Sequence, residues 1–156
     1  MKPATGFIAM LALLFSCETK MKNNEEAKIV VPIEGTWELI SGTIITKSDT
    51  VFTDYTKDQK MIKIINATHF SFLKHDMNNG KDSAAAVYES GGGSYSLVDD
   101  QYTERLDYCN AREWEGHEFN FTVTVVNDTL IQKGIEKLEN LGIDRVIIEK
   151  YKRIKD

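Results

Sequence analysis

The chain has 156 residues and a formal charge of −5, with 19 Lys and Arg residues against 24 Asp and Glu residues. This length suits one ordinary domain, and an apolar content of 42% with 10% aromatic residues excludes a wholly disordered chain. Two prolines and two cysteines exclude a collagen-like repeat and a disulfide-stapled miniprotein. The acidic balance argues against a nucleic-acid-binding protein, which usually carries a basic stripe.

The first residues have the layout of an export signal. Lys2 gives a positive start, and the run of nine apolar residues over 7–15 is shorter than the roughly 20 that a membrane-spanning helix needs. The next residues complete the segment Leu14-Phe15-Ser16-Cys17, which resembles the bacterial lipobox, where the cysteine receives a diacylglyceryl group and becomes the first residue after cleavage. We therefore expect a signal peptide over 1–16 and a lipid on Cys17. An ordinary signal peptide, with Cys17 near the cleavage site by chance, is the alternative.

The rest of the chain divides into a tether and a folded domain. Residues 17–32 are mostly polar and of mixed charge after the cysteine, which is typical of a flexible tether, and the folded domain is expected over 33–156. The expected location is outside the cytoplasm, with the protein held by its lipid in the outer membrane and facing the periplasm or the cell surface. With Cys17 lipidated, Cys109 has no disulfide partner, and a small buried apolar side chain is a better interpretation of it than a reactive thiol.

Strand signals dominate from Gly35 onward. Strands are predicted over 36–47, 61–65, 68–73, 86–90, 94–98, 102–108, 119–126, 129–133 and 145–154. Many short strands at regular spacing predict an all-β fold, an antiparallel up-and-down β-barrel of about 8–10 strands. Ile135, Leu138 and Leu141 recur at a spacing of three before Gly142, which predicts a short helix near 135–141. An irregular loop is the alternative there.

The register of one hairpin follows from a two-residue turn at Asp99-Asp100. This turn sets Leu97 opposite Tyr102 and Tyr95 opposite Glu104. The alternation then predicts that one face of the hairpin points inward, and this face carries Tyr95, Leu97, Tyr102, Glu104, Leu106 and Tyr108. The glycines at 91–93 lie opposite 106–108 and allow the strand to bend sharply, as closed sheets require.

A second hairpin is predicted at Asn127-Asp128. The turn sets Val125 opposite Leu130 and Val123 opposite Gln132. Because side chains alternate along a strand, the inner face of this hairpin is expected to carry Phe119, Phe121, Val123 and Val125.

Two features resemble known families. Gly35-Thr36-Trp37 resembles the first strand of the lipocalin and fatty-acid-binding superfamily, in which the tryptophan closes the barrel floor. The stretches KMIKIINATHFSFLKHD, GGGSYSLVDDQYTERLDYCN, REWEGHEFNFTVTV and DTLIQKGIEKLENLGIDRVIIEKYKRI are similar to an uncharacterised lipocalin-like (calycin-type) lipoprotein family of Bacteroidetes bacteria. The resemblance covers nearly all of 35–154 and implies a fold and a location, without a substrate or a catalytic residue.

The last strand departs from the better-known relatives. Fatty-acid-binding proteins often carry an inward Arg-x-Tyr that holds a carboxylate, whereas the similar place here is Glu149-Lys150-Tyr151. The resemblance therefore does not extend to fatty-acid specificity. Three short motifs, Asp49-Thr50, Asp82-Ser83 and Asp128-Thr129, resemble the O-glycosylation sites of exported Bacteroidetes proteins.

The sequence shows no constellation for metal binding or catalysis. His69 and His75 are six strand residues apart, about 20 Å, and neither a His-Glu-x-x-His nor a Gly-x-Ser-x-Gly motif occurs. We therefore expect no metal, no cofactor and no enzymatic activity.

Polar residues on inward faces give a candidate ligand site, because a buried carboxylate must be paired or lie in a wet cavity. The predicted lining is Trp37, Phe70, Phe72, Tyr95, Tyr102, Glu104, Tyr108, Phe119, Phe121, Gln132 and Tyr151. The expected function is binding of a small, partly apolar ligand, with membrane contact through the lipid alone. The alternative is a filled barrel that acts by protein contact through a loop carrying Arg112, Trp114 and His117, although Trp114 could equally cap the core.

Overall fold

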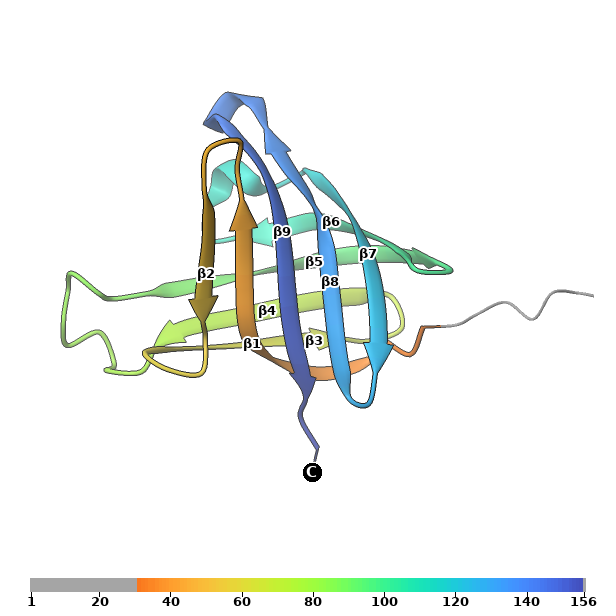
Figure 1. Ribbon diagram of the computed structural model, residues 1–156, viewed down its shortest axis with the longest axis horizontal. Coiled ribbons are helices and arrows are strands. Elements are labelled where there is room, and N and C mark those ends of the chain that lie inside the picture. Colours follow the sequence, from red (N-terminus) through yellow and green to blue (C-terminus); the bar gives the residue numbers. More distant parts are fainter. Residues whose placement is uncertain (1–30, 156) are drawn as a thin grey trace, which may run out of the picture.

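The computed structural model describes residues 31–155, which form an antiparallel β-barrel (Figure 1). The expected signal peptide, Cys17 and nearly all of the tether lie outside the described residues. The strands are β1 (Gly35–Ile45), β2 (Thr50–Asp54), β3 (Gln59–Ile65), β4 (His69–Asp76), β5 (Tyr88–Val98), β6 (Gln101–Cys109), β7 (Glu118–Val126), β8 (Thr129–Leu138) and β9 (Ile143–Arg153). Two 3-10 turns, η1 (Arg112–Trp114) and η2 (Glu139–Leu141), are the helical elements of this part of the chain, and neither is long enough to cross a membrane.

The strands run up and down around the barrel in chain order, and pairing of β1 with β9 closes it. Eight strands, β1 and β3 to β9, make the closed sheet. β2 is not part of the closed sheet. On one edge of β1, the first residues of β1 pair with β3, and Ser41–Ile45 pair with β2. The predicted all-β up-and-down barrel is confirmed, and the nine strands over 31–155 fall within the predicted number.

Both predicted hairpins are confirmed in register. Leu97 pairs with Tyr102 and Tyr95 with Glu104, while Val123 pairs with Gln132 and Val125 with Leu130. Short two-residue turns hold these registers, and Asp99, Asn127 and Asp128 adopt the positive φ angles that such turns require. The two strands predicted over 86–90 and 94–98 are one bent strand, β5.

Two predictions of secondary structure are corrected. The helix predicted over 135–141 is a single 3-10 turn at Glu139–Leu141, because Ile135 to Leu138 continue β8 and pair with β9. Gly142 does end this turn in the left-handed conformation, as its position predicts. The strand β2 was missed since its residues are mostly exposed, so no buried alternation marks it.

Tyr108 points outward, contrary to the predicted inner face. It is 71% exposed, because a β-bulge between Gly92 and Gly93 inserts Asp107 into β6 and reverses the side-chain alternation beyond it. The Asp107 carboxylate holds the bulge by accepting hydrogen bonds from the Ser94 backbone N–H at 3.2 Å and hydroxyl at 3.3 Å. A Cβ on Gly93 would lie 1.9 Å from the Arg105 carbonyl oxygen, so the close approach of β5 to β6 at the bulge requires glycine at this position.

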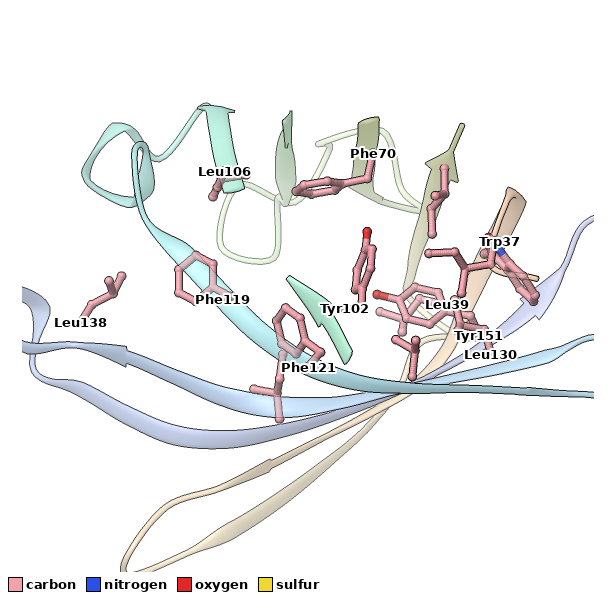
Figure 2. Close-up of a cluster of buried hydrophobic side chains, with 14 residues drawn as sticks. Trp37, Leu39, Phe70, Tyr102, Leu106, Phe119, Phe121, Leu130, Leu138 and Tyr151 are labelled. Carbon is pink, nitrogen blue, oxygen red and sulfur yellow. The ribbon is translucent and has the colours of Figure 1, made fainter. Parts of the chain in front are cut away.

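The two ends of the barrel differ. One end is closed by the turns at 66–68, 99–100 and 127–128 and by residues 31–34, and it encloses much of the core drawn in Figure 2. Trp37 is completely buried there and its indole N–H donates to the Ile33 carbonyl at 2.7 Å. The opposite end carries the longer segments 77–87 and 110–117. This second end is called the open end below.

Candidate functional site: a charged cavity at the open end

A cavity of about 450 Å³ extends from the middle of the barrel to the open end. Eight-stranded barrels are just wide enough either to be filled by side chains or to hold one small ligand, and this volume lies in the range of small-molecule sites. The interior is therefore not completely filled. Its lining combines apolar and aromatic side chains with charged and polar ones: Leu39, Ile44, Tyr55, Met61, Phe72, Leu106, Trp114, Phe119, Phe121, Ile147 and Tyr151 accompany Lys63, Lys74, Glu89, Glu104, Gln132, Glu136, Arg145 and Glu149.

The floor of the cavity is built around Lys63 on β3. Its side chain is buried, with an exposed fraction of 3%, and its ammonium group forms an ion pair with Glu104 on β6. It also donates a hydrogen bond of 2.8 Å to the Gln132 side-chain oxygen on β8. Three aromatic rings surround the same ammonium, those of Phe70, Tyr102 and Tyr151, at 5.2, 5.4 and 5.8 Å from the ring centroids. A charge this deeply buried is tolerated because it is paired on several sides.

A second ion pair lies higher in the wall. Arg145 on β9 donates to the Glu136 carboxylate on β8 at 2.6 Å. The Arg145 guanidinium also lies 5.6 Å from the ring centroid of Trp114, which packs against Phe119 at 5.8 Å. Trp114 is thus half-buried in the cavity wall. It packs against the hydrophobic core, as a residue that caps the core would.

Glu149 on β9 faces the cavity without a cationic partner among the described residues. Its carboxylate accepts a hydrogen bond of 2.7 Å from the Tyr151 hydroxyl. Burial raises the pKa of Glu149, and the charges of Glu104 and Glu136 act in the same direction, while Lys63 and the Tyr151 hydrogen bond oppose them. Burial likewise raises the pKa of Tyr151. The hydroxyl of Tyr102, whose ring lies beside the Lys63 ammonium, is buried with no hydrogen-bond partner among the described residues.

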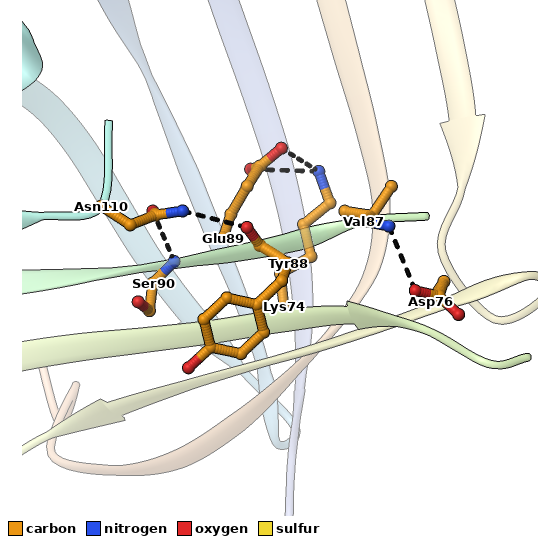
Figure 3. A network of polar contacts seen from close by, with 7 residues as sticks. All are labelled: Lys74, Asp76, Val87, Tyr88, Glu89, Ser90 and Asn110. Atoms are coloured by element: carbon orange, nitrogen blue, oxygen red, sulfur yellow. Dashed lines mark hydrogen bonds and ion pairs between the residues drawn. The ribbon is translucent and has the colours of Figure 1, made fainter. Parts of the chain in front are cut away.

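Polar contacts organise the mouth of the cavity (Figure 3). Lys74 on β4 forms an ion pair with Glu89 on β5 at 3.2 Å, and the Lys74 ammonium lies 5.5 Å from the ring centroid of Tyr55. Asn110 links β5 to the loop after β6, since its side chain accepts from the Ser90 N–H at 2.9 Å and donates to the Tyr88 carbonyl at 3.0 Å. These contacts fix the rim on the β4, β5 and β6 side.

Asp76 holds the ends of the longest rim segment, 77–87. Its carboxylate accepts backbone hydrogen bonds from Gly80 at 2.8 Å and from Asn78 and Val87 at 3.1 Å. The hydrogen bond from Gly80, followed by that from Val87, lowers the pKa of Asp76 below its ordinary value of 3.8. A carboxylate with a lowered pKa in the folded state stabilises the fold above its unfolded value, and the contribution is lost as the pH falls through the folded value.

We expect Asp76→Asn to lower the thermal unfolding midpoint at pH 6, because the amide replaces a charged acceptor of three N–H groups. The difference between wild type and variant should shrink as the pH falls from about 4 towards 2, where Asp76 itself becomes protonated. Thermal unfolding followed by circular dichroism across this pH series measures both effects. Asp82→Asn, in the same segment but exposed, is the control. A difference that stays constant with pH would contradict this role.

The structure brings together part of the predicted ligand site. Six of the predicted residues line the cavity: Phe72, Glu104, Phe119, Phe121, Gln132 and Tyr151. Trp37, Phe70 and Tyr102 are core residues below the floor, and Tyr95 lies at the closed end, where its hydroxyl donates to the Asn66 carbonyl at 2.7 Å. Tyr108 lies outside the barrel.

The loop predicted as a partner surface is tied to the barrel. Arg112 is exposed and pairs with Glu115 at 2.8 Å, and the Glu115 carboxylate accepts from the Cys109 N–H at 2.9 Å. His117 is half-buried beside β7. Cys109 lines the cavity beyond the bulge, and burial raises the pKa of its thiol, which keeps it in the neutral, less nucleophilic form.

Sequence reasoning missed most of the charged lining. Lys63, Arg145 and Glu149 each lie on an inward face that apolar neighbours at a spacing of two define, and Glu136 lies two residues before the inward Leu138. Met61 and Ile65 flank Lys63 in this way, and Ile147 and Tyr151 flank Glu149. Extending the alternation through charged positions would have found all four.

The described residues offer no group of three or more His, Cys, Asp or Glu side chains placed to hold a metal ion. Comparison of the chain with models of known protein families, and with curated proteins, finds no match.

Proposed function

We propose that this protein is a lipid-anchored, lipocalin-like protein of the cell envelope that binds a small, partly apolar ligand in the cavity at the open end of its barrel. The observation that carries the proposal is the cavity itself. Its volume of about 450 Å³ would hold a small molecule, and its lining combines aromatic and apolar side chains with polar groups that ion pairs and hydrogen bonds hold in place. Such a combination is typical of sites that bury an apolar body and orient it by polar contacts.

The anchoring part of the proposal rests on the sequence. The positive start, the short apolar run and Leu14-Phe15-Ser16-Cys17 support a lipobox. Anchoring through acyl chains at Cys17 would leave the barrel free of the bilayer, because the acyl chains alone supply the membrane affinity. Mass spectrometry of the protein from its natural source would show a diacylglyceryl-modified Cys17 as the new first residue.

Native mass spectrometry of the protein purified from the cells that produce it tests the ligand. We expect one small molecule to remain bound to the wild type. Ala111 lines the rim of the cavity and is half-exposed, so Ala111→Trp should fill the entrance and lose that molecule. Ala85→Trp adds the same side chain to the exposed 77–87 segment and should keep it. A wild type that carries no small molecule, or an Ala111→Trp variant that carries as much, would contradict the proposal.

A further inference from the structure

The charged groups that line the cavity do not balance. Three cations, Lys63, Lys74 and Arg145, face four carboxylates. Each cation already has its own carboxylate: Lys63 pairs with Glu104, Lys74 with Glu89 and Arg145 with Glu136. One negative group, that of Glu149, is therefore left without a counter-ion among the described residues.

The open space beside Glu149 is the cavity itself, which Glu149 lines. In the sheet Glu149 pairs with Gly42 on β1 and with Gln132 on β8. The Tyr55 ring packs directly over Gly42, since a Cβ on Gly42 would lie 3.0 Å from that ring, and it forms the cavity wall on this side of Glu149. The Gln132 side-chain oxygen accepts the hydrogen bond from Lys63. The hydrogen bond from the Tyr151 hydroxyl takes up one carboxylate oxygen, Oε2, and the other carboxylate oxygen has no hydrogen-bond partner among the described residues.

Glu149 is half-buried. Partial burial of a carboxylate without a counter-ion costs free energy, and a cation that entered the cavity would offset this cost. The same burial raises the pKa of Glu149. The aromatic side chains of the lining, among them Phe72 and Phe121, offer faces that attract organic cations and also accept an apolar body. A small molecule with a charged amine at one end and an apolar group at the other would satisfy both kinds of surface.

We propose that the ligand of this cavity is a small organic ammonium compound whose positive group binds the Glu149 carboxylate while its apolar part packs against the aromatic lining. This inference rests on the proposed function, since it specifies the chemical class of the ligand for the same cavity. It assigns Glu149 as the specificity-determining residue, with Tyr151 holding the carboxylate in place.

Three probes of nearly equal shape test the inference: 2-phenylethylammonium, neutral 2-phenylethanol and anionic 3-phenylpropionate. Binding to the full chain would be measured by isothermal titration calorimetry. We expect the ammonium probe to bind on the order of tenfold more tightly than the alcohol, because a charge-assisted hydrogen bond contributes more than a neutral one. The carboxylate should bind most weakly, since it would lie beside Glu149.

The variant Glu149→Gln keeps the shape and removes the charge. It should reduce the affinity for the ammonium probe to that for the alcohol, and circular dichroism would show an unchanged fold. Glu118→Gln makes the same substitution on the outer face of β7, where the side chain is 59% exposed, and should leave all three affinities unchanged. If Glu149→Gln unfolds, the order of the three probes on the wild type still decides the question.

The pH dependence gives an independent readout. The charged and titratable groups that face Glu149 are Lys63 on β3, Glu104 on β6, Glu136 on β8, Tyr151 on β9 and Tyr55 after β2. Because its pKa is raised, Glu149 should lose its proton only as the pH rises above the ordinary carboxyl range. The affinity for the ammonium probe should therefore rise from pH 4 to pH 7 in the wild type and more weakly in Glu149→Gln.

The outcomes separate this inference from the proposed function. If the alcohol or 3-phenylpropionate binds as tightly as the ammonium probe, the assignment of an ammonium ligand is wrong, although the cavity does bind small molecules. If none of the probes binds, the inference is also overturned, and the native mass spectra alone then decide on the ligand-binding function. An ammonium preference that survives in Glu149→Gln would show that another group recognises the charge.

Discussion

Lys63→Met is expected to lower the free energy of unfolding by about 3–5 kcal/mol, because removal of one partner from a buried ion pair leaves the other charge uncompensated. The Lys63 side chain is 3% exposed and that of Glu104 is 10% exposed. The variant also leaves the Gln132 side-chain oxygen without its donor and removes the cation that three aromatic rings surround. Urea unfolding followed by intrinsic fluorescence gives the difference directly.

The double variant Lys63→Met/Glu104→Leu is the matched control. Both charges are then replaced by apolar side chains of similar size, so most of the loss should be recovered, since buried pairs replaced by apolar residues are often neutral or stabilising. Lys60→Met breaks the exposed pair with Glu38, at 3.3 Å, and should cost less than about 1 kcal/mol. If Lys63→Met lowers the free energy of unfolding no more than Lys60→Met does, the buried ion pair between Lys63 and Glu104 does not contribute to stability as expected.

Trp37→Ala is the second substitution with a large expected effect, a loss of about 3–5 kcal/mol, because it removes a large buried side chain and leaves a cavity. The ring is completely buried at the closed end. It also supports neighbouring contacts: the indole donates to the Ile33 carbonyl at 2.7 Å, and the Arg153 guanidinium lies 4.0 Å from the ring centroid. Arg153 in turn donates to the carbonyls of Pro32 and Glu34 at 2.8 and 2.6 Å.

Two controls isolate the cause. Trp37→Phe retains most of the ring volume but loses the N–H, and it should cost clearly less than the alanine variant. Tyr108→Ala removes an aromatic side chain that is 71% exposed and should change the unfolding free energy by less than about 1 kcal/mol. If Trp37→Ala and Tyr108→Ala lowered the free energy of unfolding equally, the packing of Trp37 would not be what stabilises the closed end.

These two predictions concern different parts of one barrel. The interior of the closed end is apolar and stabilises the fold, whereas the interior of the open half carries the cavity and the paired charges that line it. Lys63 lies at the boundary, where the apolar core ends and the polar lining begins. We therefore expect Trp37→Phe to leave the affinity of the cavity for the ammonium probe unchanged, while changes at Glu149 alter that affinity without a large change in stability.

The sequence alone determined the architecture because it depends on local patterns. Period-two alternation and two-residue turns predicted the β5–β6 and β7–β8 hairpins in register, including the pairs Tyr95 with Glu104 and Val123 with Gln132. The inward positions of Phe119 and Phe121 followed from the same alternation. The helix predicted over 135–141 was wrong, because a spacing of three between apolar residues over so short a segment fits the end of a strand as well as a helix.

Only the tertiary structure decided what occupies the interior. The bulge that turns Tyr108 outward is invisible to a rule of strict alternation, because it depends on the contact of Gly93 with the backbone of β6. The pairing of Lys63 with Glu104 joins residues 41 positions apart, and its bond to Gln132 spans 69 positions. Closure of the barrel places these side chains together, and it leaves Glu149 as the one cavity carboxylate without a counter-ion among residues 31–155. Local pattern thus set the fold, while long-range charge pairing set the chemistry of the cavity.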